Sequence, residues 1–131
     1  MKLPDWQTRL TQYLIATAAT PYRPGRHDCA LWVAGAVETM TGQNLAPDVT
    51  YRTLDEGLTA LHSLGFDDHV AFVADRFDEV HPAFGQPGDI AMVEGDLDQS
   101  LGLVLGETAG VLGLRGWGHV PMSQVKRVWR V

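Results

Sequence analysis

Residues 25–42 read GRHDCALWVAGAVETMTG, and this stretch decides the fold. Asp28 stands directly before an apolar run, where a carboxylate can accept hydrogen bonds from the first free N–H groups of a helix. Gly42 stands directly after the run, where a helix commonly ends in a left-handed residue. The stretch therefore predicts a helix of about three turns that begins at Cys29.

Cys29 is the only cysteine of the chain, and it has two interpretations. A cysteine at a helix N terminus has its thiolate favoured by the positive end of the helix dipole, which suits a nucleophile. Unpaired cysteine is also among the most buried residue types, and the apolar run after Cys29 suits a core helix. The local sequence leaves both open. A lone cysteine forms no internal disulfide, so the redox compartment is not indicated.

Other helices are expected on both sides of this stretch. Apolar residues recur at helical spacing from Pro4 to about Ala19, and residues 20–28 then form a loop because two prolines and a glycine interrupt them. A later leucine stripe predicts a third helix that stops at Gly65. The stripe consists of Leu54, Leu58, Leu61 and Leu64. Residues 67–84 fit either a short helix, or a strand and a turn that ends at Pro82.

The residue pattern changes from helix-forming to strand-forming from Gly85 onward. Four β-rich runs are separated by glycine and turn residues, with Gly88 and Asp89 expected in a turn. These runs are GDIAMVEG, SLGLVLGE, GVLGLRG and HVPMSQVKRVWRV. Their spacing predicts a small antiparallel sheet or half-barrel. Because the helices precede the strands along the chain, we expect an α+β fold. The length of 131 residues, of which 45% are hydrophobic, is typical of a single domain, over residues 1–131.

Composition excludes some classes of function. The formal net charge of −6 and only ten basic residues argue against a nucleic-acid partner. Residues 1–20 contain no continuous apolar run, so neither a signal peptide nor a membrane span is expected, and the chain is expected to be mature and soluble. None of His62, His69 and His81 pairs with Cys29 at a metal-ligand spacing. We therefore expect no metal and no cofactor.

Three blocks of the sequence carry a resemblance to a known family. HDCALWVAGAV, QPGDIAMVEG and SLGLVLGE, in this order, resemble the NlpC-type branch of papain-like cell-wall peptidases, and more closely small relatives in phage and prophage tail modules. The resemblance implies a papain-like fold, with N-terminal helices packed on a small C-terminal antiparallel sheet. It also implies that Cys29 matches a nucleophile that attacks peptidoglycan peptides, with Asp28 as its usual neighbour. The implied location is a virion tail or phage-like particle, and the bacterial cytoplasm is the alternative.

The catalytic pattern of the resembled family is incomplete in this chain. Ser100 occupies the position of the family histidine, and a hydroxyl cannot act as general base for a cysteine. Gly113 occupies about the position of the residue that orients this histidine. His119 is the best remaining candidate for a base, ahead of His27 in the loop before the cysteine.

Two functions follow from the resemblance. The first is a degenerate peptidase acting as a structural or binding component, with phage-like tail proteins or bacterial cell-wall peptide as partners. It predicts a contact surface that includes residues 125–131 as an exposed edge strand. The second is an active cysteine peptidase that uses Cys29 and His119. Because the base is missing, the sequence favours the first.

Overall fold

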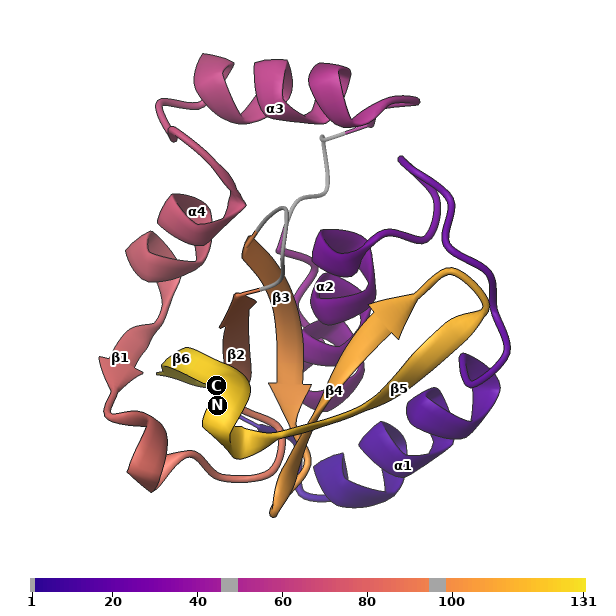
Figure 1. Cartoon of the computed structure of the whole chain (residues 1–131), viewed down its shortest axis with the longest axis vertical. Coiled ribbons are helices and arrows are strands. Elements are labelled where there is room, and N and C mark those ends of the chain that lie inside the picture. Colours follow the sequence, from indigo (N-terminus) through magenta and orange to yellow (C-terminus); the bar gives the residue numbers. More distant parts are fainter. Residues whose placement is uncertain (1, 46–49, 95–98) are drawn as a thin grey trace.

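The computed structural model describes residues 2–45, 50–94 and 99–131, and these form an α+β fold (Figure 1). The α-helices of this part are α1 (Trp6–Ala16), α2 (Cys29–Thr41), α3 (Leu54–Ser63) and α4 (His69–Arg76). The strands are β1 (Asp78–Val80), β2 (Ile90–Glu94), β3 (Gln99–Val104), β4 (Thr108–Gly113), β5 (Gly116–Pro121) and β6 (Val125–Arg130). Short 3₁₀ turns η1 (Pro82–Phe84) and η2 (Met122–Gln124) precede β2 and β6.

The strands form one antiparallel sheet in the order β1-β6-β2-β3-β4-β5. The strand β6 lies between β1 and β2, so the expectation of an exposed edge strand at residues 125–131 is wrong. Its Val128 and Trp129 are fully buried on opposite faces, because an interior strand is covered on both sides. The edges of the sheet are β1 and β5.

The helix α2 confirms the prediction for residues 29–41. Asp28 accepts a hydrogen bond from the Leu31 N–H at 2.9 Å, and Gly42 ends the helix with φ of 79°. Five apolar side chains of α2 are buried against the sheet. These are Trp32, Val33, Ala36, Val37 and Met40. Figure 1 shows α2 behind the sheet, with α1 running beside the β4–β5 hairpin.

The third helix is confirmed, but its leucine stripe is not a core face. Leu54, Leu58 and Leu64 keep 55%, 41% and 52% of their surface exposed. The buried residue of α3 is Gly57, whose position would bring an added Cβ to 3.1 Å from the Tyr51 ring. The helix therefore packs through its smallest side chain.

The middle and the end of the chain hold more elements than the sequence predicts. Residues 67–84 contain both a helix and a strand, because α4 is followed by β1, and the turn η1 begins at Pro82 instead of ending there. The last of the four β-rich runs contains the end of β5, the turn η2 and the whole of β6. The turn at Gly88 is confirmed by its φ of 91°.

The sheet separates two apolar clusters. One lies between the sheet and the helices and includes Leu101 and Leu103 of β3; the other lies on the opposite face and includes Val104. Side chains of a strand alternate between its faces. Ser100 therefore lies on the face of β3 that is turned away from α2.

Candidate functional site

The carboxylate of Asp28 is the centre of the candidate site. Its side chain is 3% exposed, and both of its oxygens accept hydrogen bonds. The oxygen Oδ1 accepts from the Leu31 N–H, while Oδ2 accepts from the Gly25 N–H at 3.1 Å and from the Tyr51 hydroxyl. One buried carboxylate thus joins the start of α2, the loop before it and the segment before α3.

Cys29 begins α2 and is half-buried beside this carboxylate. Two tyrosines share its environment. Burial raises the pKa of Tyr51, and so do its hydrogen bond to Asp28 and the nearby charges of Asp28 and Cys29. Burial also raises the pKa of Tyr22, with the charges of Asp28 and Cys29 as further causes. Both hydroxyls therefore stay protonated and can donate hydrogen bonds at neutral pH.

The loop before Cys29 has a fixed geometry. The backbones of Arg23 and His27 form a two-way bridge, with N–H to O distances of 2.8 Å and 2.7 Å. Gly25 has φ of 76°, and an added Cβ there would lie 1.9 Å from the Tyr51 carbonyl oxygen. Only glycine allows this approach of the two backbones. The Nε2 atom of His27 is buried and has no hydrogen-bond partner within the described residues.

His119, the predicted base, lies on the same face of the sheet as α2 but is held by other groups. Its Nδ1 is 2.8 Å from the Thr108 hydroxyl, and its ring meets the edge of Trp117 at 5.1 Å between centroids. Trp117 in turn stacks on Trp32 of α2, at 6.0 Å. A Cys29–His119 pair stays a prediction.

The two remaining positions of the family pattern offer no titrating group. Ser100 pairs with Val93 across β2 and β3, and both side chains lie on the face away from α2. Gly113 ends β4 opposite Gly116 in the β4–β5 turn.

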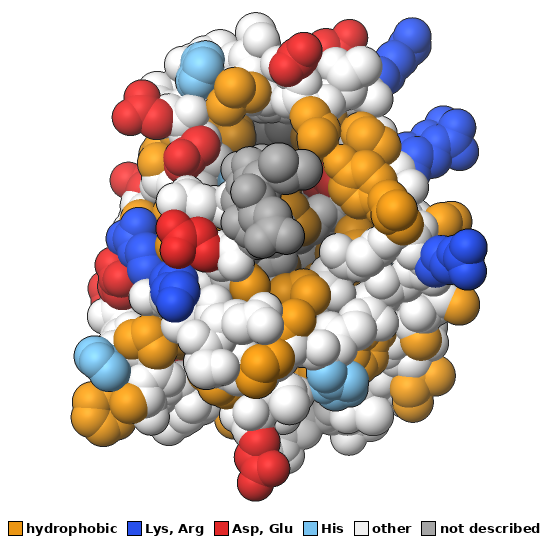
Figure 2. Space-filling view, in the orientation of Figure 1, with side chains coloured by type: hydrophobic (Ala, Val, Ile, Leu, Met, Phe, Trp, Pro, Cys, Tyr) orange, Lys and Arg blue, Asp and Glu red, His pale blue; other side chains and the backbone are white. Residues whose placement is uncertain are grey.

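A pocket of about 550 Å³ adjoins the Asp28 cluster. It is lined by Arg23, Pro24, Gly25, Arg26, Thr50, Tyr51, Arg52 and Glu56. We call it the arginine pocket. Figure 2 shows blue side chains along the upper right margin of the molecule and another blue group on the left, where most of the red side chains also lie.

The sequence interpretation missed the arginine pocket and both tyrosines. A signal was present, because the chain contains the dipeptide Tyr-Arg twice, at residues 22–23 and 51–52. The two copies come together in the fold, because Arg23, Tyr51 and Arg52 line one pocket and the charge of Tyr22 acts on Tyr51. Because the two dipeptides lie far apart in the sequence, their proximity in the fold could not be predicted from it.

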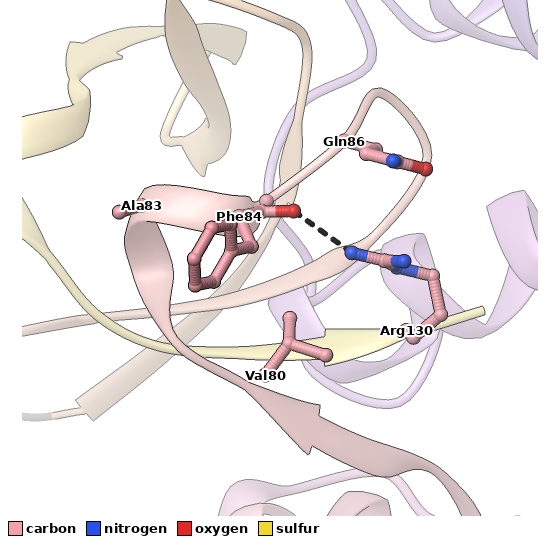
Figure 3. A pocket seen from close by; sticks show the side chains of 6 residues that line it. Val80, Ala83, Phe84, Gln86 and Arg130 are labelled. Carbon is pink, nitrogen blue, oxygen red and sulfur yellow. Dashed lines mark hydrogen bonds between the residues drawn. The ribbon is translucent and has the colours of Figure 1, made fainter.

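A second pocket, of about 590 Å³, shares no lining residue with the first. Figure 3 shows Arg130 reaching across it to the Phe84 carbonyl, at 2.8 Å. The same guanidinium donates to Asp89 at 2.9 Å, and Asp89 is fully buried. Asp89 also accepts from the backbone N–H groups of Gln86 and Val131. Asp89 is thus more than the turn residue predicted from sequence, since it ties the start of β2 to the end of β6.

Residues 2–45, 50–94 and 99–131 show neither a cluster of metal ligands nor a membrane-spanning helix. These residues contain no group of three or more His, Cys, Asp or Glu side chains that could hold a metal ion. Their helices are all too short or too polar to cross a membrane.

The fold and the site together define an α+β protein in which a cysteine opens a buried helix that packs on an antiparallel sheet. The chain belongs to the family described as a domain of unknown function (DUF6950), and the match covers residues 1–131. No curated protein matches the sequence.

Proposed function

We propose that this protein is a papain-like, NlpC-type module that binds bacterial cell-wall peptide without cleaving it, as a component of a phage or prophage tail. The tail setting rests on the sequence resemblance alone. Support for the fold assignment comes from the order of elements, with a helix that opens at Cys29 and packs on β3 of an antiparallel sheet.

The loss of the general base carries the proposal. The family position for histidine holds Ser100, and this side chain lies on the face of the sheet away from Cys29. A thiol needs a nearby group that accepts its proton and then protonates the leaving amine. A site without that group keeps the shape for binding a peptide but loses most of the rate enhancement.

The active peptidase remains the second candidate, because His119 lies on the helix-facing side of the sheet. In this candidate the imidazole leaves Thr108 and approaches Cys29 when a peptide binds. The two candidates differ in whether product formation depends on Cys29.

The test combines cleavage, binding and thiol reactivity. Purified protein, Cys29→Ala and His119→Ala are each incubated with peptidoglycan sacculi, and released peptides are measured by mass spectrometry. We expect all three proteins to co-sediment with sacculi and none to release peptides. We also expect the rate of Cys29 alkylation by iodoacetamide between pH 5 and 9 to be the same in wild type and His119→Ala. Peptide release that disappears in Cys29→Ala refutes the non-cleaving role, and a failure to co-sediment refutes the binding role.

A further inference from the structure

The arginine pocket contains three of the four arginines that have no carboxylate partner in the described structure. Four other arginines form ion pairs with an aspartate or a glutamate. These are Arg9, Arg76, Arg127 and Arg130. Arg23, Arg26 and Arg52 form none within the described residues, although the chain carries a net charge of −6. Within the part of the chain that the structure describes, guanidinium groups without a carboxylate partner thus lie around one pocket of an acidic protein.

Hydrogen bonds to neighbouring groups connect the walls of the pocket. The Arg23–His27 backbone bridge fixes one wall, and the Tyr51 bond to Asp28 fixes the other. Glu56 accepts from the Arg52 backbone N–H at 2.9 Å, which ties the start of α3 to the same wall. The volume of about 550 Å³ falls within the range of small-ligand sites. The arginine side chains themselves are exposed, so a ligand can reach them from solvent.

We propose that the arginine pocket binds carboxylate groups of an acidic peptide. A guanidinium presents paired N–H donors that match the two oxygens of a carboxylate. Glu56 lines the same pocket, where its Oε2 accepts from the Arg52 N–H and its Oε1 can accept from an N–H group of a peptide. Its negative charge opposes a phosphate dianion more strongly than a single carboxylate. The mixture of three positive groups and one negative group therefore fits an acidic peptide better than a phosphate.

The position of the pocket links this inference to the site. Gly25 and Tyr51 line the pocket and also donate to Asp28, the residue that caps the helix beginning at Cys29. A peptide held by its carboxylates would therefore lie next to the N terminus of α2. The inference deepens the proposed function by naming the groups that the site binds. It rests on the proposed function for one point, that the peptide comes from the bacterial cell wall.

The direct test uses soluble probes. The tetrapeptide Ala-Glu-Glu-Ala is titrated into the ¹⁵N-labelled full chain, with Ala-Gln-Gln-Ala and inorganic phosphate as comparisons, and binding is followed by NMR. We expect Ala-Glu-Glu-Ala to shift the amides of Gly25 and Arg52, and to bind more weakly as salt rises. We expect little effect from the other two probes. Equal binding of the two peptides, or tighter binding of phosphate, overturns the proposal.

Variants identify the residues responsible. Arg23→Gln and Arg52→Gln are each expected to weaken Ala-Glu-Glu-Ala binding about tenfold, the loss of one charge-assisted hydrogen bond. Lys126→Gln removes the same charge from an exposed position in β6 and is expected to leave binding unchanged. All three replace exposed side chains, so folding should be preserved, which the NMR spectrum checks directly. If Lys126→Gln weakens peptide binding as much as the two arginine variants do, binding depends on the net charge of the protein and not on the pocket. This result overturns the proposal.

The sacculus assay separates this inference from the proposed function. If the tetrapeptide binds in the pocket but the protein does not co-sediment with sacculi, the cell-wall role fails and the pocket stands. If sacculi bind wild type and Arg23→Gln/Arg52→Gln equally, the cell-wall role stands and the inference about the pocket is wrong.

Discussion

Removal of the Asp28 carboxylate tests whether this one buried group organises the site. In Asp28→Ala, α2 loses its N-terminal cap, which costs about 1 kcal/mol. The Gly25 N–H and the Tyr51 hydroxyl also lose their acceptor, and each such group costs roughly 1 kcal/mol or more when it stays out of water. The free energy of unfolding should therefore fall by about 3 kcal/mol. Urea denaturation followed by tryptophan fluorescence measures this change.

A double-mutant cycle isolates the contribution of the Asp28–Tyr51 contact. Tyr51→Phe alone should cost about 1.5 kcal/mol, because it removes a hydrogen bond to a charged group. With Asp28→Ala already present, the same change should cost at least about 1 kcal/mol less. Asp5→Ala is the matched control, because Asp5 precedes α1 as Asp28 precedes α2 but forms no capping hydrogen bond. Additive effects of Asp28→Ala and Tyr51→Phe, or an equal loss in Asp5→Ala, would refute the reasoning.

Three further predictions concern residues away from the pocket. Asp89→Asn should lower the free energy of unfolding by about 3 kcal/mol in urea denaturation, because Arg130 loses its buried counter-charge; a loss below about 1 kcal/mol contradicts this. Burial raises the pKa of Tyr13 from 10.0 to about 12, so the folded state holds this proton more tightly than the unfolded state does. Its stabilising effect is complete below pH 10 and is lost as pH rises toward 12, and Tyr13→Phe should flatten the fall in stability measured across this range. Gly35→Ala should destabilise by about 1–3 kcal/mol instead of stabilising the helix, because its Cβ would lie 2.5 Å from the Tyr13 hydroxyl that donates to Trp32; an increase in melting temperature would be inconsistent with this packing.

Local sequence rules predict part of the fold well. The start and end of α2 follow from Asp28 and Gly42, because capping and left-handed turns depend only on neighbouring residues. The turn at Gly88 follows for the same reason. The leucine stripe correctly predicts the helix α3 but does not predict which of its residues are buried. Helical spacing of apolar residues indicates a helix, but it does not show whether another element packs against that face.

Contacts between distant residues are not predictable in this way. The place of β6 depends on pairing with β1 and β2, which no property of residues 125–130 indicates. The bond from Tyr51 to Asp28 joins residues 23 positions apart, and the arginine pocket is lined by residues from both of the segments that this bond connects. Sequence reasoning therefore identified Cys29 and the Asp28 cap as parts of the site. The tyrosines and arginines around them could be identified only from the folded structure.

The place of β6 between β1 and β2 also constrains how the protein folds during synthesis. The strands β1 and β2 leave the ribosome earlier than β6, yet they have no direct pairing with each other and meet only through it. Until residues 125–130 emerge, both strands carry an unpaired edge that can join another nascent chain. Completion of the sheet is thus delayed until the last strand arrives, and shielding of the growing chain by a chaperone would matter most in that interval.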